Sequence, residues 1–262
     1  MVPRPAAPIL VVVAHCDDEV IGAGGHLAEW AASFTLLHVT DSAPADGVDA
    51  AAAGCSTPRA YSAARRAELD AALAYLPRPP AEMLTIGVPD REAIVYLRDI
   101  VVALRGIVSA LRPATIVTHA YEGGHPDHDA IAFAVATVRS MRDTPRFATI
   151  EFAAYHESPS GDFVTNRFAD AVDGAVLLSP AVQAIKQSML RCFTTQQRVL
   201  AAFDCRYESI RPAGETDFMT PPASGRVWFD RLGWGVTGES WRAAARDAAE
   251  RLAREEGACS RS

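Results

Sequence analysis

The stretch that decides the fold is Ile9-Leu-Val-Val-Val-Ala14, followed at once by His15-Cys-Asp-Asp-Glu19. A continuous apolar run, mostly β-branched, predicts a strand that is buried on both faces. Over roughly the first 150 residues, short runs of this kind alternate with longer segments of helical periodicity. This alternation is typical of βαβ units, so the sequence predicts an α/β fold with a mainly parallel sheet and helices on both faces.

The expected elements follow from periodicity and from turn residues. Strands are predicted at 9–14, 34–40, 83–87, 115–119 and 148–155, and helices at 20–33, 59–76, 97–111, 180–203 and 240–256. Another helix is expected to begin at Pro126, because proline is favoured in the first turn. Residues 41–58 are predicted to form a loop long enough to act as a lid. Residues 211–238 show no clear period, and we expect an irregular region at 205–240 to pack beside the functional site.

Length and charge limit the classes of partner. The chain has 262 residues and a net charge of −7, and 49% of its residues are hydrophobic. One domain spanning 1–262 is the simplest expectation for a soluble chain of this length. Nucleic acid and anionic membranes both attract basic surfaces, so neither is expected as a partner. A neutral or cationic small molecule fits better.

The cysteines and the apolar runs indicate a reducing compartment. The five cysteines are scattered and show no CxxC spacing, so neither a disulfide framework nor a thiolate zinc site is predicted. The run at 9–14 is too short to span a bilayer, and the residues before it do not resemble a signal peptide. We therefore expect a cytoplasmic protein without a membrane anchor. No pattern in the sequence indicates its oligomeric state.

Two polar clusters each follow a predicted strand and precede a predicted helix. The first is His15 to Glu19, and the second is His125-Pro-Asp-His128. Ligands bind at the carboxyl ends of parallel strands, so the two clusters are expected to face one another. Imidazoles and carboxylates are ligands that zinc accepts, and a three-ligand site leaves a position open for water. Spacing alone does not say which aspartate is a ligand and which is a base.

These residues, and others near them, also have plainer interpretations. An aspartate before a helix often only caps it. Gly22-Ala-Gly24-Gly25 is similar to a dinucleotide fingerprint, but the third glycine would fall at Leu27, so close helix packing is favoured. His26 and His38 are expected to be structural, with satisfied hydrogen bonds. For His119, at the end of a strand, a role behind a metal ligand and a purely structural role are equally favoured.

In these two motifs the chain resembles the PIG-L/LmbE-like family of N-acetylglucosaminyl deacetylases. The resemblance implies a Rossmann-like α/β fold that hydrolyses acetamides on sugars with Zn²⁺, or with Fe²⁺ as the alternative metal. By motif position, the metal ligands would be His15, Asp18 and His128. Asp17 would be the general base, and His125 would stabilise the oxyanion or protonate the leaving amine. Glu19 would orient the loop, and Asp127 would cap or orient its helix.

The resemblance extends to residues expected to bind substrate. Arg65 in Arg65-Arg-Ala-Glu68 is similar to a family arginine that faces the substrate, and Asp90 is similar to a carboxylate that binds sugar hydroxyls. Tyr121 belongs to a tyrosine-bearing form of the second motif, and Asp41 is a weaker candidate for a hydroxyl contact. Each has a plainer alternative: Arg65 as an exposed residue paired with Glu68 or Asp70, Asp90 in a turn, and Tyr121 packed at a strand end.

One position departs from the family pattern. Cys16 stands where the family usually has proline, so the loop loses a fixed φ angle and gains a thiol. The favoured interpretation is a small apolar residue packed under the loop. Ligation of the metal by a thiolate is the alternative.

These observations predict a metal-dependent hydrolase that removes an N-acetyl group from an amino sugar or its conjugate. Water activated by the metal and deprotonated by Asp17 would attack the acyl carbon. Two alternatives stay open: a hydrolase with the same metal site that acts on another amide or ester, and a carbohydrate-binding protein without catalytic activity. The presence of Asp17 argues against the second.

Overall fold

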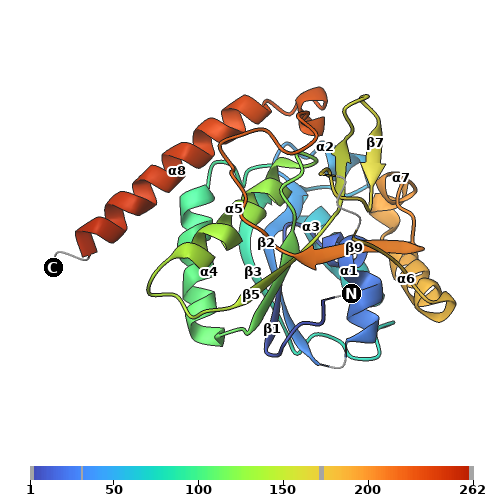
Figure 1. Ribbon diagram of the computed structural model, residues 1–262. Helices are drawn as coiled ribbons and strands as arrows, with labels where there is room; N and C mark the ends of the chain where they lie inside the picture. The colour runs from blue at the N-terminus through green and yellow to red at the C-terminus, as the bar shows by residue number, and fades with distance from the viewer. Residues whose placement is uncertain (1–2, 31, 171–173, 260–262) are drawn as a thin grey trace.

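A seven-stranded sheet, in the order β3-β2-β1-β4-β5-β9-β8, lies at the centre of the computed structural model (Figure 1). The structure describes residues 3–30, 32–170 and 174–259. The strands of this sheet are β1 (Ile9–Val13), β2 (Phe34–Pro44), β3 (Glu82–Asp90), β4 (Thr115–His119), β5 (Ala148–Phe152), β8 (Ala175–Leu177) and β9 (Tyr207–Pro212). A separate hairpin joins β6 (Tyr155–Glu157) to β7 (Phe163–Thr165).

Most of the sheet is parallel. β1 pairs in parallel with β2 and β4, and the parallel pairing continues outward to β3 and to β5. Beyond β5, β9 and β8 form an antiparallel edge. The order of the five parallel strands is that of a Rossmann-like sheet. The predicted α/β fold is therefore confirmed, although the antiparallel edge was not predicted.

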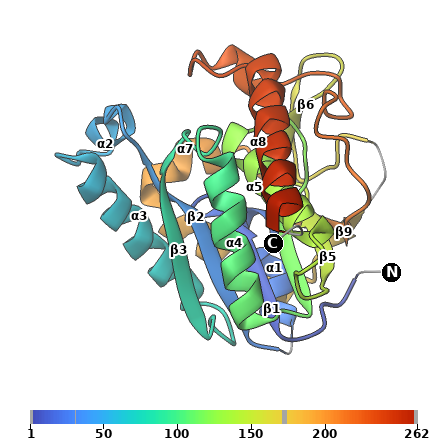
Figure 2. The ribbon, with the colours of Figure 1, turned by 90° about the vertical axis from the view of Figure 1, so that its left-hand side faces the viewer.

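Helices cover both faces of the sheet. They are α1 (Asp18–Glu29), α2 (Val48–Ala52), α3 (Pro58–Leu73), α4 (Leu97–Leu111), α5 (Pro126–Ser140), α6 (Pro180–Cys192), α7 (Gln197–Leu200) and α8 (Gly238–Cys259), with short 3₁₀ turns η1 (Thr194–Gln196) and η2 (Trp228–Arg231). Figures 1 and 2 show α4, α5 and α8 on one side of the sheet, while α1 and α6 lie on the other. The far end of α8 projects from the body of the molecule.

The side chains of β1 pack into two separate hydrophobic cores, one on each face of the sheet. Successive side chains of a strand point to opposite faces. Leu10 and Val12 accordingly pack in the core that includes α4, α5 and α8, whereas Val11 and Val13 pack in the core on the side of α1, α3 and α6. Because both faces are covered, every residue of β1 is buried.

The boundaries nearest the candidate site differ from the sequence prediction. The first helix begins at Asp18, two residues earlier than expected, so Asp18 belongs to its first turn. β2 continues to Pro44, and a short helix follows at α2, so the prediction of a structureless loop at 41–58 is wrong. β3 is also longer than predicted and ends at Asp90. Continued pairing of β2 with β3, interrupted by two register shifts, lengthens both strands.

The predicted helix at 180–203 is interrupted after Cys192. The Glu68 carboxylate accepts hydrogen bonds from the backbone N–H and hydroxyl of Thr195 and from the hydroxyl of Thr194. These bonds hold the chain in the 3₁₀ turn η1 between α6 and α7. The predicted strand at 148–155 is likewise divided into β5 and the start of β6.

The region at 205–240 is only partly irregular. It contains β9 and η2, and the Trp228 backbone N–H donates to the Gly123 carbonyl, 2.7 Å away, in the loop before α5.

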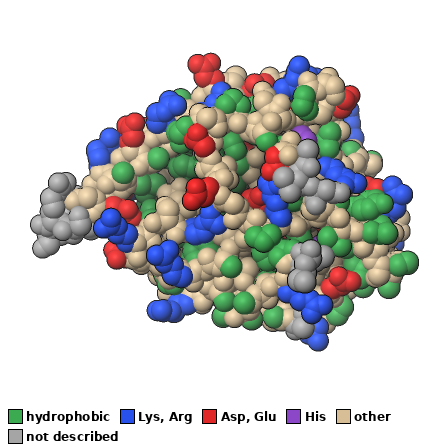
Figure 3. Space-filling model, viewed as in Figure 1, with side chains coloured by type: hydrophobic (Ala, Val, Ile, Leu, Met, Phe, Trp, Pro, Cys, Tyr) green, Lys and Arg blue, Asp and Glu red, His purple; other side chains and the backbone are tan. Residues whose placement is uncertain are grey.

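None of the described helices is long and apolar enough to cross a membrane. On the face seen in Figure 3, acidic and basic side chains are interspersed.

Candidate metal centre

The two polar clusters meet at the carboxyl edge of the sheet. His15 and Asp18 follow β1, Asp90 ends β3, and His125 and His128 lie at the start of α5, directly after the β4 loop. Parallel strands present their carboxyl ends on one edge, so residues distant in sequence become neighbours. These side chains are all buried, with at most 8% of each residue exposed.

Three side chains converge as a metal site requires. His15 Nδ1 and His128 Nε2 lie 3.3 Å apart. The Asp18 carboxylate lies 3.2 Å from His15 Nδ1 and 3.1 Å from His128 Nε2. Ligand atoms of a tetrahedral site with bonds of about 2.0–2.1 Å are separated by about 3.3 Å. The separations match those around a single zinc-sized ion, with Asp18 Oδ2 facing His15 and Asp18 Oδ1 facing His128.

Neighbouring residues enlarge the set of potential ligands. Ligand atoms also gather within 4.8 Å of one another in three overlapping groups, which are His15, His125 and His128; His15, Asp90, His125 and Asp127; and Asp18, His119 and His128. None of these groups holds His15, Asp18 and His128 together, but His15 and Asp18 each share a group with His128.

Two carboxylates contact Nε2 of His15, the ring nitrogen that does not face His128. This Nε2 lies 2.9 Å from Asp90 Oδ1 and 3.3 Å from Asp127 Oδ2. Burial disfavours the charged imidazole, but Asp90, Asp18 and Asp127 outweigh it and raise the pKa of His15 well above its usual value. When Nε2 donates to a carboxylate, Nδ1 is the nitrogen left to bind a metal.

Asp18 organises the loop as well as facing the two histidines. Its Oδ2 accepts a 2.7 Å hydrogen bond from the His15 backbone N–H and lies 3.3 Å from His119 Nε2. Burial and the neighbouring His128 lower the pKa of His119 to about 4, so its ring is neutral at pH 7. His119 also accepts from the Ala14 backbone N–H. An Nε2 that accepts this bond has no proton to give to Asp18, so His119 joins the residue after β1 to the end of β4 beside the Asp18 carboxylate.

Asp17, the predicted base, lies beside the trio and against Arg65. It occupies the N-cap position of α1, but its side chain makes no capping hydrogen bond. Its Oδ2 is instead 2.9 Å from Arg65 Nη2. Burial raises the pKa of Asp17 to about 6, although Arg65 lowers it. Arg65 is only 4% exposed, so its alternative interpretation as an exposed helix residue is wrong.

His125 presents one defined nitrogen to the cluster. Its Nδ1 accepts the backbone N–H of Asp127 at 3.2 Å, which caps the start of α5. Burial, together with His15 and His128, lowers the pKa of His125 well below its usual value. A neutral imidazole that accepts at Nδ1 carries its proton on Nε2. That N–H points toward the cluster, where Asp90 Oδ1 is 3.9 Å away.

Two other predicted residues, Asp127 and Glu19, are fully buried next to the cluster motifs. The Asp127 carboxylate accepts the backbone N–H groups of Arg91 and Ala93 and so attaches the loop after β3 to α5. Glu19 is fully buried, with its Oε1 3.5 Å from His38 Nε2.

Of two residues predicted to contact the sugar, one lies at the edge of the cluster and the other lies away from it. Asp41 Oδ1 accepts from the Asp90 backbone N–H, which brings it to the edge of the cluster. The Tyr121 hydroxyl instead donates to the Thr220 carbonyl, and its ring packs on Phe218 and Trp241. The structure does not bring Tyr121 into the cluster.

Sequence reasoning missed three residues around the histidines. The Trp234 ring lies 5.0 Å from the His125 ring, and the Arg91 guanidinium lies 4.4 Å from the centre of the Trp234 ring. The Tyr155 ring meets His128 edge-on at 5.4 Å. Tyr155 could have been found, because it ends the strand predicted next to that of His119. Trp234 lies in the region at 205–240 that was expected beside the site, whereas Arg91 gave no such signal.

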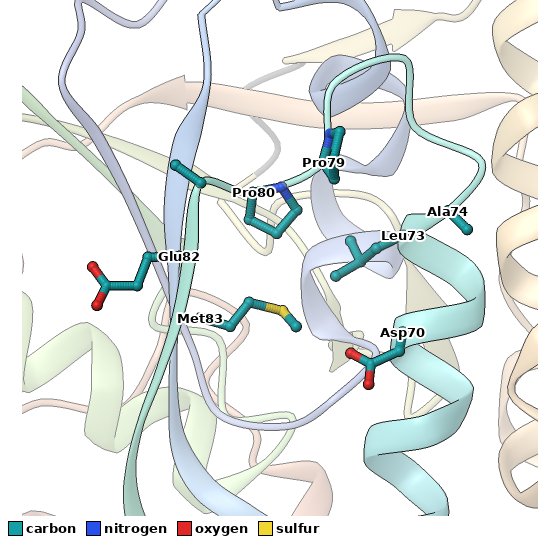
Figure 4. Close-up of a pocket in the computed structure, with 8 residues that line it drawn as sticks. Asp70, Leu73, Ala74, Pro79, Pro80, Glu82 and Met83 are labelled. Carbon is teal, nitrogen blue, oxygen red and sulfur yellow. The ribbon is translucent and has the colours of Figure 1, made fainter.

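The cavity shown in Figure 4 is remote from this cluster. It has a volume of about 370 Å³ and lies between the end of α3 and the start of β3. Leu73 and Met83 face each other across it. This is the amino-terminal end of β3, whereas the histidines lie at the carboxyl ends of the strands. Ligands of parallel sheets bind at the carboxyl ends, so this cavity is not the candidate site.

One known family matches part of the chain. The sequence model of the PIG-L family, described as GlcNAc-PI de-N-acetylase, matches residues 10–138, a range that contains both polar clusters. About half of the chain is therefore similar to the PIG-L family. No curated protein matches it.

Solved structures share the fold of this chain. A deacetylase–teicoplanin complex is 17% identical, with a TM-score of 0.58, over 80% of this chain and 99% of that one. The zinc-inhibited form of teicoplanin deacetylase is 16% identical, with a TM-score of 0.55, over 79% and 99%. N,N'-diacetylchitobiose deacetylase from Pyrococcus horikoshii is 15% identical, with a TM-score of 0.54, over 78% and 83%. At these identities the likeness shows a common fold.

Cys16 marks a local departure from the PIG-L family pattern. The residue is buried in the core on the α1 side, and burial raises the pKa of its thiol to about 11. Its backbone N–H donates to Ser42 Oγ at 2.8 Å, a bond that proline could not make. These contacts agree with the favoured interpretation of Cys16 as a small packing residue.

Proposed function

We propose that this protein is a metal-dependent N-deacetylase that acts on an N-acetylated amino sugar or its conjugate. The observation that carries the proposal is the convergence of His15, Asp18 and His128 at separations of 3.1–3.3 Å. Asp17 adjoins this trio in the sequence, and the match to the PIG-L family points to the same reaction.

The metal is proposed to be Zn²⁺, with Fe²⁺ as the alternative. Two imidazoles and one carboxylate are ligands suited to either ion. Once bound there, the metal would polarise the acyl carbonyl and make a water molecule acidic enough to ionise near neutral pH. Asp90 and Asp127 would keep Nδ1 of His15 directed at the ion.

Asp17 and His125 divide the proton transfers and charge stabilisation. Asp17 takes a proton from the attacking water, whose oxygen bonds to the acyl carbon. The neutral His125 donates its Nε2–H to the oxyanion that forms. As the C–N bond breaks, Asp17 returns the proton to the leaving nitrogen, so the products are acetate and a free amine.

The substrate class rests on the family and on the relatives. Two of the solved structures with this fold are deacetylases of teicoplanin and of N,N'-diacetylchitobiose. A net charge of −7 suits a substrate that is neutral or becomes cationic on losing its acetyl group. Asp41 and Asp90, at the edge of the cluster, are proposed to meet sugar hydroxyls. Tyr121 and Arg65 are predicted contacts on the resemblance alone.

We further propose that residues 1–262 form one domain that works in a reducing cytoplasm. Contacts between the loop before α5 and the region at 205–240 support a single unit. The described cysteines at 16, 55, 192 and 205 are free thiols, as a reducing compartment would keep them.

Metal analysis combined with acetate release tests the proposal. The purified protein is expected to hold one divalent metal per chain and to release acetate from at least one sugar in a panel of N-acetyl amino sugars. Asp17→Asn should retain the metal and lose activity. An Asp17→Asn variant as active as the wild type would refute the mechanism.

A further inference from the structure

Arg65 is buried deeply for an arginine. It lies in α3 on the inward face formed with Tyr61 and Leu69, one turn away on either side. The Arg65 side chain is only 5% exposed. A buried guanidinium is costly unless an opposite charge and hydrogen bonds compensate for it.

The compensating charge is Asp17. Arg65 Nη2 lies 2.9 Å from Asp17 Oδ2. The Arg65 guanidinium also lies 5.9 Å from the centre of the Tyr61 ring, whereas its Nε has no hydrogen-bond partner among the described residues. Of the contacts described for Arg65, the one with Asp17 is the only ion pair within 4 Å.

The Asp17 carboxylate in turn needs a contact that fixes its orientation. Its carboxylate is not used to cap α1, and it lies next to Asp18 and Glu19, both of which repel it. A carboxylate can rotate about its last bond, and a catalytic group displaced by about 1 Å can lose about 100-fold in rate. With Oδ2 held by Arg65, Oδ1 is the oxygen left to accept a proton.

We propose that Arg65 is a positioning residue, which holds Asp17 in the orientation that takes a proton from the attacking water. This inference rests on the proposed deacetylase function. It replaces the direct sugar contact that the family resemblance predicts for Arg65. A side chain so little exposed and already committed to Asp17 has little surface to offer a sugar hydroxyl.

Steady-state kinetics separate the two roles. Arg65→Met is expected to lower kcat by about 100-fold while KM stays within about twofold of the wild type. Arg65→Lys should recover part of kcat, because lysine keeps the charge but not the planar fork. Arg66→Met is the matched control: Arg66 is the next residue in α3, is partly exposed and pairs with Asp70. It should behave as the wild type.

A thermal cycle on chelator-treated protein tests the pair without turnover. Asp17→Asn should lower the Tm because it leaves Arg65 buried and unpaired, and adding Arg65→Met should raise the Tm again. Additive Tm changes would overturn the pairing. An active wild type with unchanged kcat in Arg65→Met, or with raised KM alone, would overturn the positioning role. A wild type that releases no acetate from any N-acetyl sugar would refute the proposed function and this role with it.

Discussion

Replacing Asp90 with asparagine tests how the metal site is supported. Asp90 Oδ1 is the nearer of two carboxylate oxygens around His15 Nε2, at 2.9 Å against 3.3 Å for Asp127. Loss of such a partner behind a metal-binding histidine costs about 10–100-fold in metal affinity, or about 1.4–2.8 kcal/mol. Because Asp127 can still accept the proton of His15 Nε2, we expect Asp90→Asn to weaken metal binding by about tenfold.

The assay is a competition for Zn²⁺ between the protein and a chromophoric chelator. Asp127→Asn should have a smaller effect than Asp90→Asn, since its contact with His15 is longer. Asp46→Asn removes a carboxylate that is about half exposed, and serves as the control. Unchanged metal affinity in Asp90→Asn would refute this reasoning; a raised KM for the sugar beside it would leave Asp90 with the proposed hydroxyl contact alone.

Three further predictions concern the folded chain. Lys186→Met should lower the free energy of unfolding, measured in urea, by about 3–5 kcal/mol, because it leaves the buried Glu208 carboxylate without its 2.6 Å partner. Adding Glu208→Gln should restore most of this loss. Burial opposes ionisation of Glu208, but Lys186 and His26 lower its pKa from 4.5 to about 2. The ionised Glu208 therefore stabilises the fold above about pH 4.5 and loses this effect as pH falls toward 2. The free energy of unfolding of Glu208→Gln should accordingly change less with pH in that window than that of the wild type. Ellman's reagent should leave Cys16 unmodified in the native protein, and rapid labelling of Cys16 would contradict its burial.

Local signals predicted the centre of the fold well. The apolar run at 9–14 gave β1, and the steps of three and four residues before Pro113 gave α4 with its observed ends. Pro126 marked the start of α5. Each of these signals lies within the element itself, so no knowledge of the rest of the chain was needed.

Features that depend on distant partners were not predictable. The break between α6 and α7 depends on Glu68, more than 120 residues earlier in the chain. The extension of β2 past Thr40 depends on pairing with β3. In the candidate site, two motifs at strand ends predicted which residues gather, but the contact of Arg65 with Asp17 and that of Trp234 with His125 arise only from tertiary packing.

The most direct test of the metal site is a crystal structure of the zinc-loaded protein with anomalous data collected at the zinc edge. We predict one peak, about 2.0–2.1 Å from His15 Nδ1 and from His128 Nε2 and within bonding distance of the Asp18 carboxylate. A peak among His15 Nε2, Asp90 and Asp127, or no peak at all, would contradict the proposed metal site.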